Sequence, residues 1–270
     1  MLKLFLKGFI IGIGKIIPGL SGSLLAINFN VYERAIKAIS TFFSDWKENL
    51  RFLVILGTGI FLAIVMGSKI IIYLLNNYKF ITLMFFIGLI LGGTKNFSKT
   101  VNYNKKSIII IIITFILFSL LSLGNISNKY ILHNNYLDIL IFILGGFIEI
   151  IASIVPGISG TALLMICGIY EKILEMTSLI LNYQYVINNI RLYLSYGFGM
   201  FISFIITISL INYLLNNKKE IIYSVILGLA LSSIIFLIIY TFMVKLSIIS
   251  LIIGLLLLII GLKLSVYLEK

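Results

Sequence analysis

Long apolar segments joined by short polar connections make up most of this 270-residue chain. The pattern predicts six uninterrupted helices, near residues 51–75, 80–95, 107–123, 191–215, 221–241 and 246–266. Several of these segments have the roughly 20 apolar residues that a helix needs to cross a bilayer, and 80–95 is the shortest. Two further apolar segments, at about 4–29 and 139–168, are each interrupted by a Pro-Gly pair. Because the segments are continuously apolar rather than alternating, we expect membrane-spanning helices and not a β-barrel.

Composition and charge agree with a polytopic membrane protein. Hydrophobic residues make up 61% of the chain and charged residues only 11%, which is too few to cover a soluble domain of this length. The net charge of +12 would suggest nucleic-acid binding in a soluble protein, whereas here it fits basic loops on the cytoplasmic side of a membrane. With a single cysteine, Cys167, and a single histidine, His133, we expect neither a disulfide framework nor a metal site.

The chain contains an internal repeat that covers most of its length. Residues 8–33 (GFIIGIGKIIPGLSGSLLAINFNVYE) match residues 146–171 (GFIEIIASIVPGISGTALLMICGIYE) at a constant offset of 138. Further along the offset is 140, where the matched residues are Arg51, Gly57, Gly59, Tyr73, Asn76, Asn77 and Gly88 with Arg191, Gly197, Gly199, Tyr213, Asn216, Asn217 and Gly228. We therefore expect one membrane domain, 1–270, that arose by duplication, with repeat 1 at about 1–123 and repeat 2 at about 137–266.

Loop charge predicts how the two repeats are oriented. If each interrupted segment is a re-entrant hairpin, each repeat crosses the membrane three times, and the second repeat is inverted relative to the first. With the N-terminus in the cytoplasm, most basic residues then lie in cytoplasmic connections, and the loop positions on the other side are only Lys79, Lys129, Lys172 and Lys245. The expected fold is therefore all-α, with two inverted-topology repeats, each a re-entrant helical hairpin plus three transmembrane helices, and both termini cytoplasmic.

The two interruptions are candidates for a binding site. The only two prolines of the chain lie at the same place in the repeat, where each stops a helix. The glycines beside them permit a tight reversal, and the following serines are good N-caps for a half-helix whose free amides favour an anion. The alternative is a packing kink, which small residues in membrane helices often form. The candidate substrate-binding residues are Pro18, Gly19, Ser21, Gly22, Pro156, Gly157, Ser159 and Gly160.

Two charged residues lie inside the interrupted apolar segments, where ionisable groups are costly and usually functional. Lys15 and Glu149 each precede the proline of their own repeat, and the matching positions of the other repeat hold Ser153 and Ile11. The two charges can form a cross-repeat ion pair or a proton-coupled site. The alternative for each is a side chain that extends to the membrane interface.

Two arginines and two glutamates are matched between the repeats. Arg51 and Arg191 each begin the helix that follows the polar connection, where a guanidinium suits a phosphate ligand or serves as an interfacial anchor. Glu33 and Glu171 follow matched tyrosines, and they are candidates to cap a helix or to pair with these arginines.

The motifs PGLSGS…VYE and PGISGT…GIYE resemble those of the bacterial polyprenyl-phosphate transporter family, formerly a domain of unknown function. Members of that family are implicated in returning undecaprenyl phosphate, the lipid carrier of cell-wall synthesis, to the cytoplasmic leaflet. The resemblance spans nearly the whole chain and is closest in the second repeat. The first repeat departs from the usual pattern at Ser23 and Asn30, where glycine is usual, and at Lys15, where the residue is often acidic.

The resemblance implies a transporter of the bacterial cytoplasmic membrane that binds a polyprenyl phosphate. It implies that Ser21, Ser159 and neighbouring amides hold the phosphate at two hairpin tips, with Arg51 and Arg191 as ligands on alternate sides. Glu149 is then a candidate for proton coupling, and no other cofactor is expected. A small-anion transporter or channel that uses the same helix tips is the alternative function. An enzyme on lipid phosphates, such as a membrane phosphatase, would need a nucleophile and an acid/base pair. It is not expected, because the single histidine, His133, has no acid-phosphatase-like cluster of arginine and histidine around it.

Overall fold

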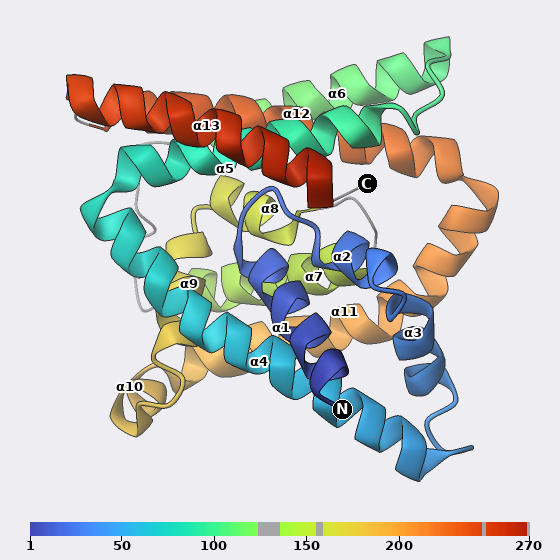
Figure 1. Ribbon diagram of the computed structural model, residues 1–270. Coiled ribbons are helices and arrows are strands. Elements are labelled where there is room, and N and C mark those ends of the chain that lie inside the picture. The colour runs from blue at the N-terminus through green and yellow to red at the C-terminus, as the bar shows by residue number, and fades with distance from the viewer. Residues whose placement is uncertain (124–135, 155–158, 245–246, 269–270) are drawn as a thin grey trace.

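The computed structural model describes residues 1–123, 136–154, 159–244 and 247–268, with the backbone alone described for 96, 121–123 and 208–217 (Figure 1). Within these ranges the chain forms helices and no strand, as predicted. The helices are α1 (Leu2–Ile16), α2 (Gly22–Asn28), α3 (Tyr32–Ser40), α4 (Trp46–Asn77), α5 (Lys79–Ser98), α6 (Lys105–Leu123), α7 (Tyr136–Ile154), α8 (Gly160–Ile166), α9 (Tyr170–Ser178), α10 (Tyr183–Asn188), α11 (Ile190–Asn217), α12 (Lys219–Phe242) and α13 (Ile248–Leu268).

The apolar segments of the sequence become long helices. The segment 80–95, the shortest expected from the sequence, is the 20-residue helix α5, which begins directly after α4 ends. Five stretches of the described residues are long and apolar enough to cross a membrane, namely Trp46–Asn77, Tyr136–Ile154, Ile190–Thr207, Lys219–Phe242 and Ile248–Leu268. The chain is therefore a multi-pass membrane protein. One of the five, Tyr136–Ile154, is the first arm of the second interrupted segment, which the sequence assigned to a re-entrant hairpin.

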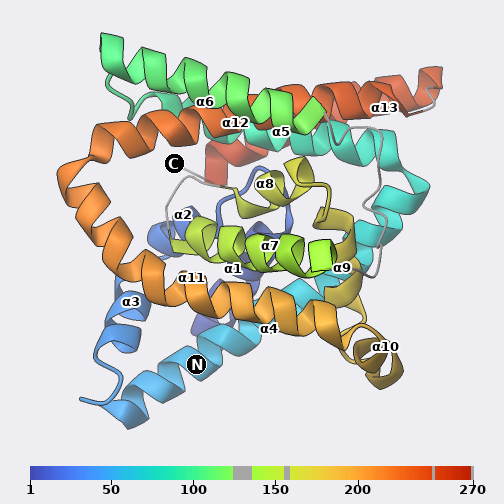
Figure 2. The same ribbon diagram turned by 180° about the vertical axis from the view of Figure 1, so that it is seen from behind.

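Matching helices of the two repeats make matching contacts. Helix α1 packs along α4 as α7 packs along α11, and α5 packs along α13 as α12 packs along α6. Figure 1 and Figure 2 show α5, α6, α12 and α13 in one layer and α1, α4, α7 and α11 in another, with the short helices α2 and α8 between the layers. The two interrupted segments therefore lie at the centre of the molecule.

Glycines allow the paired helices to approach closely, and they do so at matching positions. A Cβ atom on Gly8 would lie 2.4 Å from the carbonyl oxygen of Leu56, and one on Gly146 would lie 2.1 Å from that of Tyr196. These distances are far below van der Waals contact, so neither position can hold a larger residue unless the helices separate. Small residues serve this purpose between membrane helices, where apolar side chains gain little from leaving lipid.

The connections gather at two opposite ends of the molecule. In both views α9 and α10 lie at the end where α4 passes into α5, which is the left end in Figure 1. Helix α3 lies at the other end, where α11 passes into α12 and α5 connects to α6 (Figure 1 and Figure 2). These are called the α9 end and the α3 end below.

Candidate functional site

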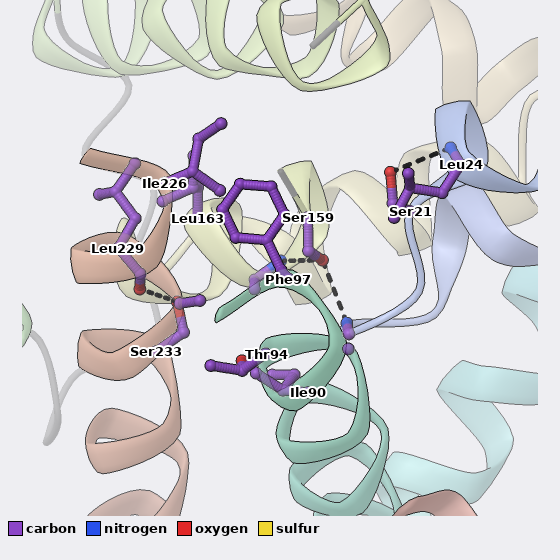
Figure 3. Close-up of a pocket in the computed structure, with 14 residues that line it drawn as sticks. Ser21, Leu24, Ile90, Thr94, Phe97, Ser159, Leu163, Ile226, Leu229 and Ser233 are labelled. Atoms are coloured by element: carbon purple, nitrogen blue, oxygen red, sulfur yellow. Dashed lines mark hydrogen bonds between the residues drawn. The ribbon is translucent and has the colours of Figure 1, made fainter. Parts of the chain in front are cut away.

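The first hairpin turns where the sequence predicted. Helix α1 stops at Ile16, two residues before the buried Pro18, and the chain reverses at Gly19, whose φ of 95° is in the left-handed region that favours glycine. Ser21 then caps α2, because its hydroxyl accepts a hydrogen bond of 3.4 Å from the amide of Leu24 (Figure 3).

The second hairpin has the same local structure at its described residues. Helix α7 stops at Ile154 and α8 begins at Gly160. Ser159 caps α8 by accepting a hydrogen bond of 3.3 Å from the amide of Ala162. The predicted residues Pro156 and Gly157 lie outside the described residues. The N-cap positions predicted for Ser21 and Ser159 are both observed, because capping depends only on the local sequence.

The two hairpin tips touch each other. The amide of Gly19 donates a hydrogen bond of 3.1 Å to the hydroxyl of Ser159, which also caps α8 (Figure 3). The first tip is also pressed against α5, since a Cβ atom on Gly19 would lie 2.5 Å from the amide nitrogen of Ile90. Capping serines from both repeats thus come together at the centre of the protein, 138 positions apart in the sequence.

A small cavity of about 40 Å³ lies between the tips and helices α5 and α12. Ser21, Ser159, Thr94 and Ser233 contribute hydroxyl groups to its lining, and Phe97 contributes its ring (Figure 3). The Thr94 hydroxyl oxygen is buried and has no hydrogen-bond partner among the described residues. The cavity has room for water but not for a lipid headgroup.

Two matched tyrosines form hydrogen bonds between the repeats, each to the hairpin of the other repeat. The Tyr32 hydroxyl donates a 2.8 Å hydrogen bond to the carbonyl oxygen of Ile154, and the Tyr170 hydroxyl donates a 2.6 Å bond to that of Ile16. The two acceptors are the last residues of α1 and α7, where carbonyl groups lack helical partners. The repeated Tyr-Glu motif signalled these tyrosines in the sequence, but their role required the structure.

A much larger cavity, of about 940 Å³, opens beside the tips and is lined by α3. Lys15 and Glu149 lie in it and form an ion pair of 3.4 Å, with side chains only 23% and 15% exposed. Lys15 also donates a 2.8 Å hydrogen bond to Ser153, the residue that matches it in the other repeat. Of the alternatives left open by the sequence, the cross-repeat ion pair is the one observed.

Other walls of this large cavity are mostly apolar. Side chains from α1, α3, α4 and α11 line it, and Gly22 and Gly160 bring the first residues of both half-helices to it. The apolar lining residues include Ile11, Ile36, Leu56, Ile60 and Phe204. The cavity therefore combines two lysines (Lys15 and Lys37), two glutamates (Glu33 and Glu149), two helix starts and a broad apolar wall. Its basic groups and its apolar wall suit an anionic head with an apolar tail.

The remaining predicted residues lie away from the tips. Arg51 and Arg191 are exposed and line neither cavity, and the Arg51 guanidinium lies 3.4 Å from the sulfur of Met1. Glu33 lines the large cavity, in the first turn of α3. Glu171 pairs not with an arginine but with Lys79, at 3.2 Å, which the sequence did not single out.

The comparisons with known proteins agree with the resemblance seen in the sequence. Residues 11–186 match the VCA0040-like family, described as undecaprenyl phosphate translocase-like. The polyprenyl-phosphate transporter of Staphylococcus aureus is 28% identical over 236 residues, which cover 84% of this chain and 83% of that protein. The polyprenyl-phosphate transporter of Vibrio cholerae is 29% identical over 188 residues, 64% of this chain and 59% of that protein.

No solved structure matches the chain. The family and both relatives are named for translocation or transport and not for an enzymatic reaction, and the matched residues include the whole of both interrupted segments after Ile10. The chain therefore belongs to the undecaprenyl phosphate translocase-like family.

Proposed function

We propose that this protein moves undecaprenyl phosphate between the leaflets of the bacterial cytoplasmic membrane, so that the lipid carrier is reused in envelope synthesis. The observation that carries the proposal is the large cavity beside the hairpin tips. It places a partly buried lysine, Lys15, in a largely apolar space of about 940 Å³, whose other charged lining residues are Glu33, Lys37 and Glu149. A polyprenyl phosphate has the same division between a charged head and a long apolar tail.

In the proposed complex the phosphate lies near Lys15 and the starts of the two half-helices. The lysine supplies a positive charge, and the first turns of α2 and α8 supply amides that have no helical acceptor. Ser23, which is buried and lines the same cavity, supplies a hydroxyl group. The departure of the first repeat from the family pattern at Lys15 and Ser23 therefore adds polar groups on the side of the anion.

The prenyl chain occupies the apolar wall in this proposal. Ile36 on α3 and Ile60 on α4 face the cavity, as does Phe204 on α11. A space of about 940 Å³ is at the upper end of the range for small-molecule sites, so it holds the head and the first part of a tail. The rest of the tail stays in the bilayer, where it has no desolvation cost.

Transport by exchange between two inverted states follows from the repeat. The reciprocal tyrosine bonds and the matched helix pairs support a two-fold relation between the repeats, and the position of their connections at opposite ends supports inversion. The α3 end is the cytoplasmic end in this proposal, because the basic connections gather there. The cavity lies on the α3 side of the tips, and in this proposal the structure is therefore a cytoplasm-facing state.

Arg51 and Arg191 keep their predicted role as phosphate ligands at the two entrances. Arg51 lies in the second turn of α4 and Arg191 in the first turn of α11, and these helices start at opposite ends of the molecule (Figure 1). An exposed guanidinium at each end attracts a lipid phosphate at the membrane surface. Glu149 stays the candidate for proton coupling, because its carboxylate competes with the phosphate for Lys15.

Reconstituted vesicles test the proposal. Purified protein in liposomes should accelerate the exchange of a fluorescent polyprenyl phosphate between leaflets above the rate in empty liposomes, at mildly acidic or neutral pH. Liposomes loaded with inorganic phosphate test the small-anion alternative in the same preparation. Phosphate efflux without lipid exchange would support that alternative, and lipid exchange no faster than in empty liposomes at every pH would refute the proposed function.

A further inference from the structure

A second lysine–glutamate pair lies at the α9 end, away from both cavities. Lys79, the first residue of α5, donates to the Glu171 carboxylate at 3.2 Å, and the Tyr240 hydroxyl donates to the same oxygen at 3.2 Å. Lys79 also donates to the Tyr240 hydroxyl, and its ammonium group lies 4.3 Å from the centre of that ring. The Lys79–Glu171–Tyr240 cluster thus joins the starts of α5 and α9 to the last turns of α12.

Helix α9, which carries Glu171 of this cluster, is packed closely onto the protein. Helix α9 packs against α4, and its Leu174 is only 3% exposed within the main core. The matching residue of α3, Ile36, is 42% exposed and lines the large cavity. Two helices with matching sequence positions therefore differ in packing: α9 is closed onto the protein, and α3 borders an open space.

The positions of the α3 end that match Lys79 and Glu171 also hold a lysine and a glutamate, but these two residues do not form an ion pair in the structure. At the repeat offsets of 138 and 140, Glu171 corresponds to Glu33 and Lys79 corresponds to Lys219. Glu33 forms no hydrogen bond or ion pair with any residue that the structure describes, and the Lys219 ammonium lies over the ring of Tyr223 at 5.3 Å. Both residues lie at the α3 end, on α3 and at the start of α12 (Figure 1).

We infer that the Lys79–Glu171–Tyr240 cluster is the gate that closes the α9 end, and that Glu33 and Lys219 form the matching gate at the α3 end when the protein changes state. The inference rests on the proposed exchange between two inverted states. In that exchange the two ends are open in turn, so the pair at each end forms when its end closes. Tyr240 has no aromatic counterpart, since Thr100 is at the matching position, and the α9 gate is therefore the stronger of the two.

The exposure of the cluster suits a gate that must open. The side chains of Lys79 and Glu171 are 23% and 32% exposed, so water screens the pair and its loss changes the balance between states without unfolding the protein. A shift in that balance alters access at both ends in opposite directions. This reciprocal change separates a gate from a local structural contact.

The rates of cysteine labelling at Leu174 and Ile36 measure how accessible the α9 end and the α3 end are. In a Cys167→Ser background in detergent, a maleimide should react quickly with Ile36→Cys and slowly with Leu174→Cys. Adding Lys79→Gln should raise the rate at Leu174→Cys roughly five-fold, the factor expected for a partly exposed ion pair, and lower the rate at Ile36→Cys. The charge exchange Lys79→Glu with Glu171→Lys should restore both rates towards those of the background.

A matched control removes the charge of a glutamate in a different ion pair. Arg34 and Glu48 form a 2.6 Å bridge between α3 and α4, and Glu48→Gln should leave labelling at the α9 end unchanged. If Leu174→Cys does not fold, Thr177→Cys on α9 and its match Ile39→Cys on α3 take the places of the two reporters.

The outcomes separate the gate from the transport function. An unchanged rate at Leu174→Cys in both Lys79→Gln and Glu171→Gln overturns the gate, even if liposomes exchange the lipid. Reciprocal labelling changes in a protein that exchanges no lipid uphold the gate as a conformational contact and reject the proposed substrate. A rise in labelling at both ends shows loosening of the fold and also overturns the gate.

Discussion

Replacing Lys15 by methionine is expected to weaken binding of polyprenyl phosphate by about tenfold or more. In the structure the Lys15 ammonium lies 3.4 Å from Glu149 and 2.8 Å from the Ser153 hydroxyl, inside the large cavity. Methionine keeps the length and most of the apolar stem but has no charge. The substitution therefore removes the one lysine that we place beside the phosphate.

The size of the effect follows from the exposure of the site. A hydrogen bond to a charged group contributes about 1.5–3 kcal/mol, and about 1.4 kcal/mol corresponds to a tenfold change in affinity. Because the Lys15 side chain is 23% exposed, we take the lower end of that range, which gives about tenfold. In Lys15→Met the Glu149 carboxylate has lost this partner and repels the phosphate. The loss of affinity in this single variant should therefore be more than tenfold.

Glu149→Gln and the double variant separate these two contributions. Fluorescence anisotropy of a labelled polyprenyl phosphate in micelles gives the Kd of each variant, and thermal unfolding checks that each is folded. The double variant Lys15→Met with Glu149→Gln should remain about tenfold weaker than the parent, because the phosphate contact is still missing. Lys37→Met, a charge loss elsewhere in the same cavity, should change Kd less than about twofold.

Recovery of parental affinity in the double variant would refute this reasoning. It would mean that Lys15 serves only to neutralise Glu149 and that the phosphate binds elsewhere. An equal loss of affinity in Lys37→Met would also contradict it, since the effect would then come from the general charge of the cavity and not from one contact.

Two further predictions concern the packing that holds the hairpins. Gly199→Ala places a Cβ 2.0 Å from the carbonyl oxygen of Ile143, so it should destabilise the protein by about 1–3 kcal/mol. The control is Gly197→Ala, which should not lower Tm because the site has open space around it. Equal melting temperatures for the two variants would show that this close approach is absent. Tyr170→Phe removes the 2.6 Å bond to Ile16 and should cost about 1 kcal/mol, a fall in Tm of roughly 2–4 °C, and an unchanged Tm would contradict the proposed fastening of the hairpin.

The helix ends were predictable because their causes are local. Pro18 stops α1 since proline cannot donate the backbone hydrogen bond and its ring clashes with the preceding turn. Ser21 and Ser159 cap the next half-helices through amides only three residues away. The matched glycines were visible as a repeat, but their contacts with partner helices were not, because a glycine in a sequence does not identify the helix it faces.

The ion-pair partners of the charged residues could not be predicted from the sequence. The sequence offered Glu171 an arginine as partner, and the structure gives it Lys79, 92 positions earlier. Which charges meet depends on how two helices are rotated about their axes and how closely they pack, and both are set by many apolar contacts at once. The tyrosine bonds between the hairpins are hidden from the sequence for the same reason.

The sequence by itself determined the long apolar helices, the internal repeat and the two interrupted segments, since hydrophobic length, proline and capping act within a few residues. It did not predict the short helices α3, α9 and α10 in the polar connections. Only the tertiary structure decided that Lys15 meets Glu149, that the tips touch through Gly19 and Ser159, and that a large cavity lies on the α3 side of those tips. In the proposed exchange, the two similar repeats allow two alternative packings, and a free-energy difference of a few kcal/mol between whole states selects one of them.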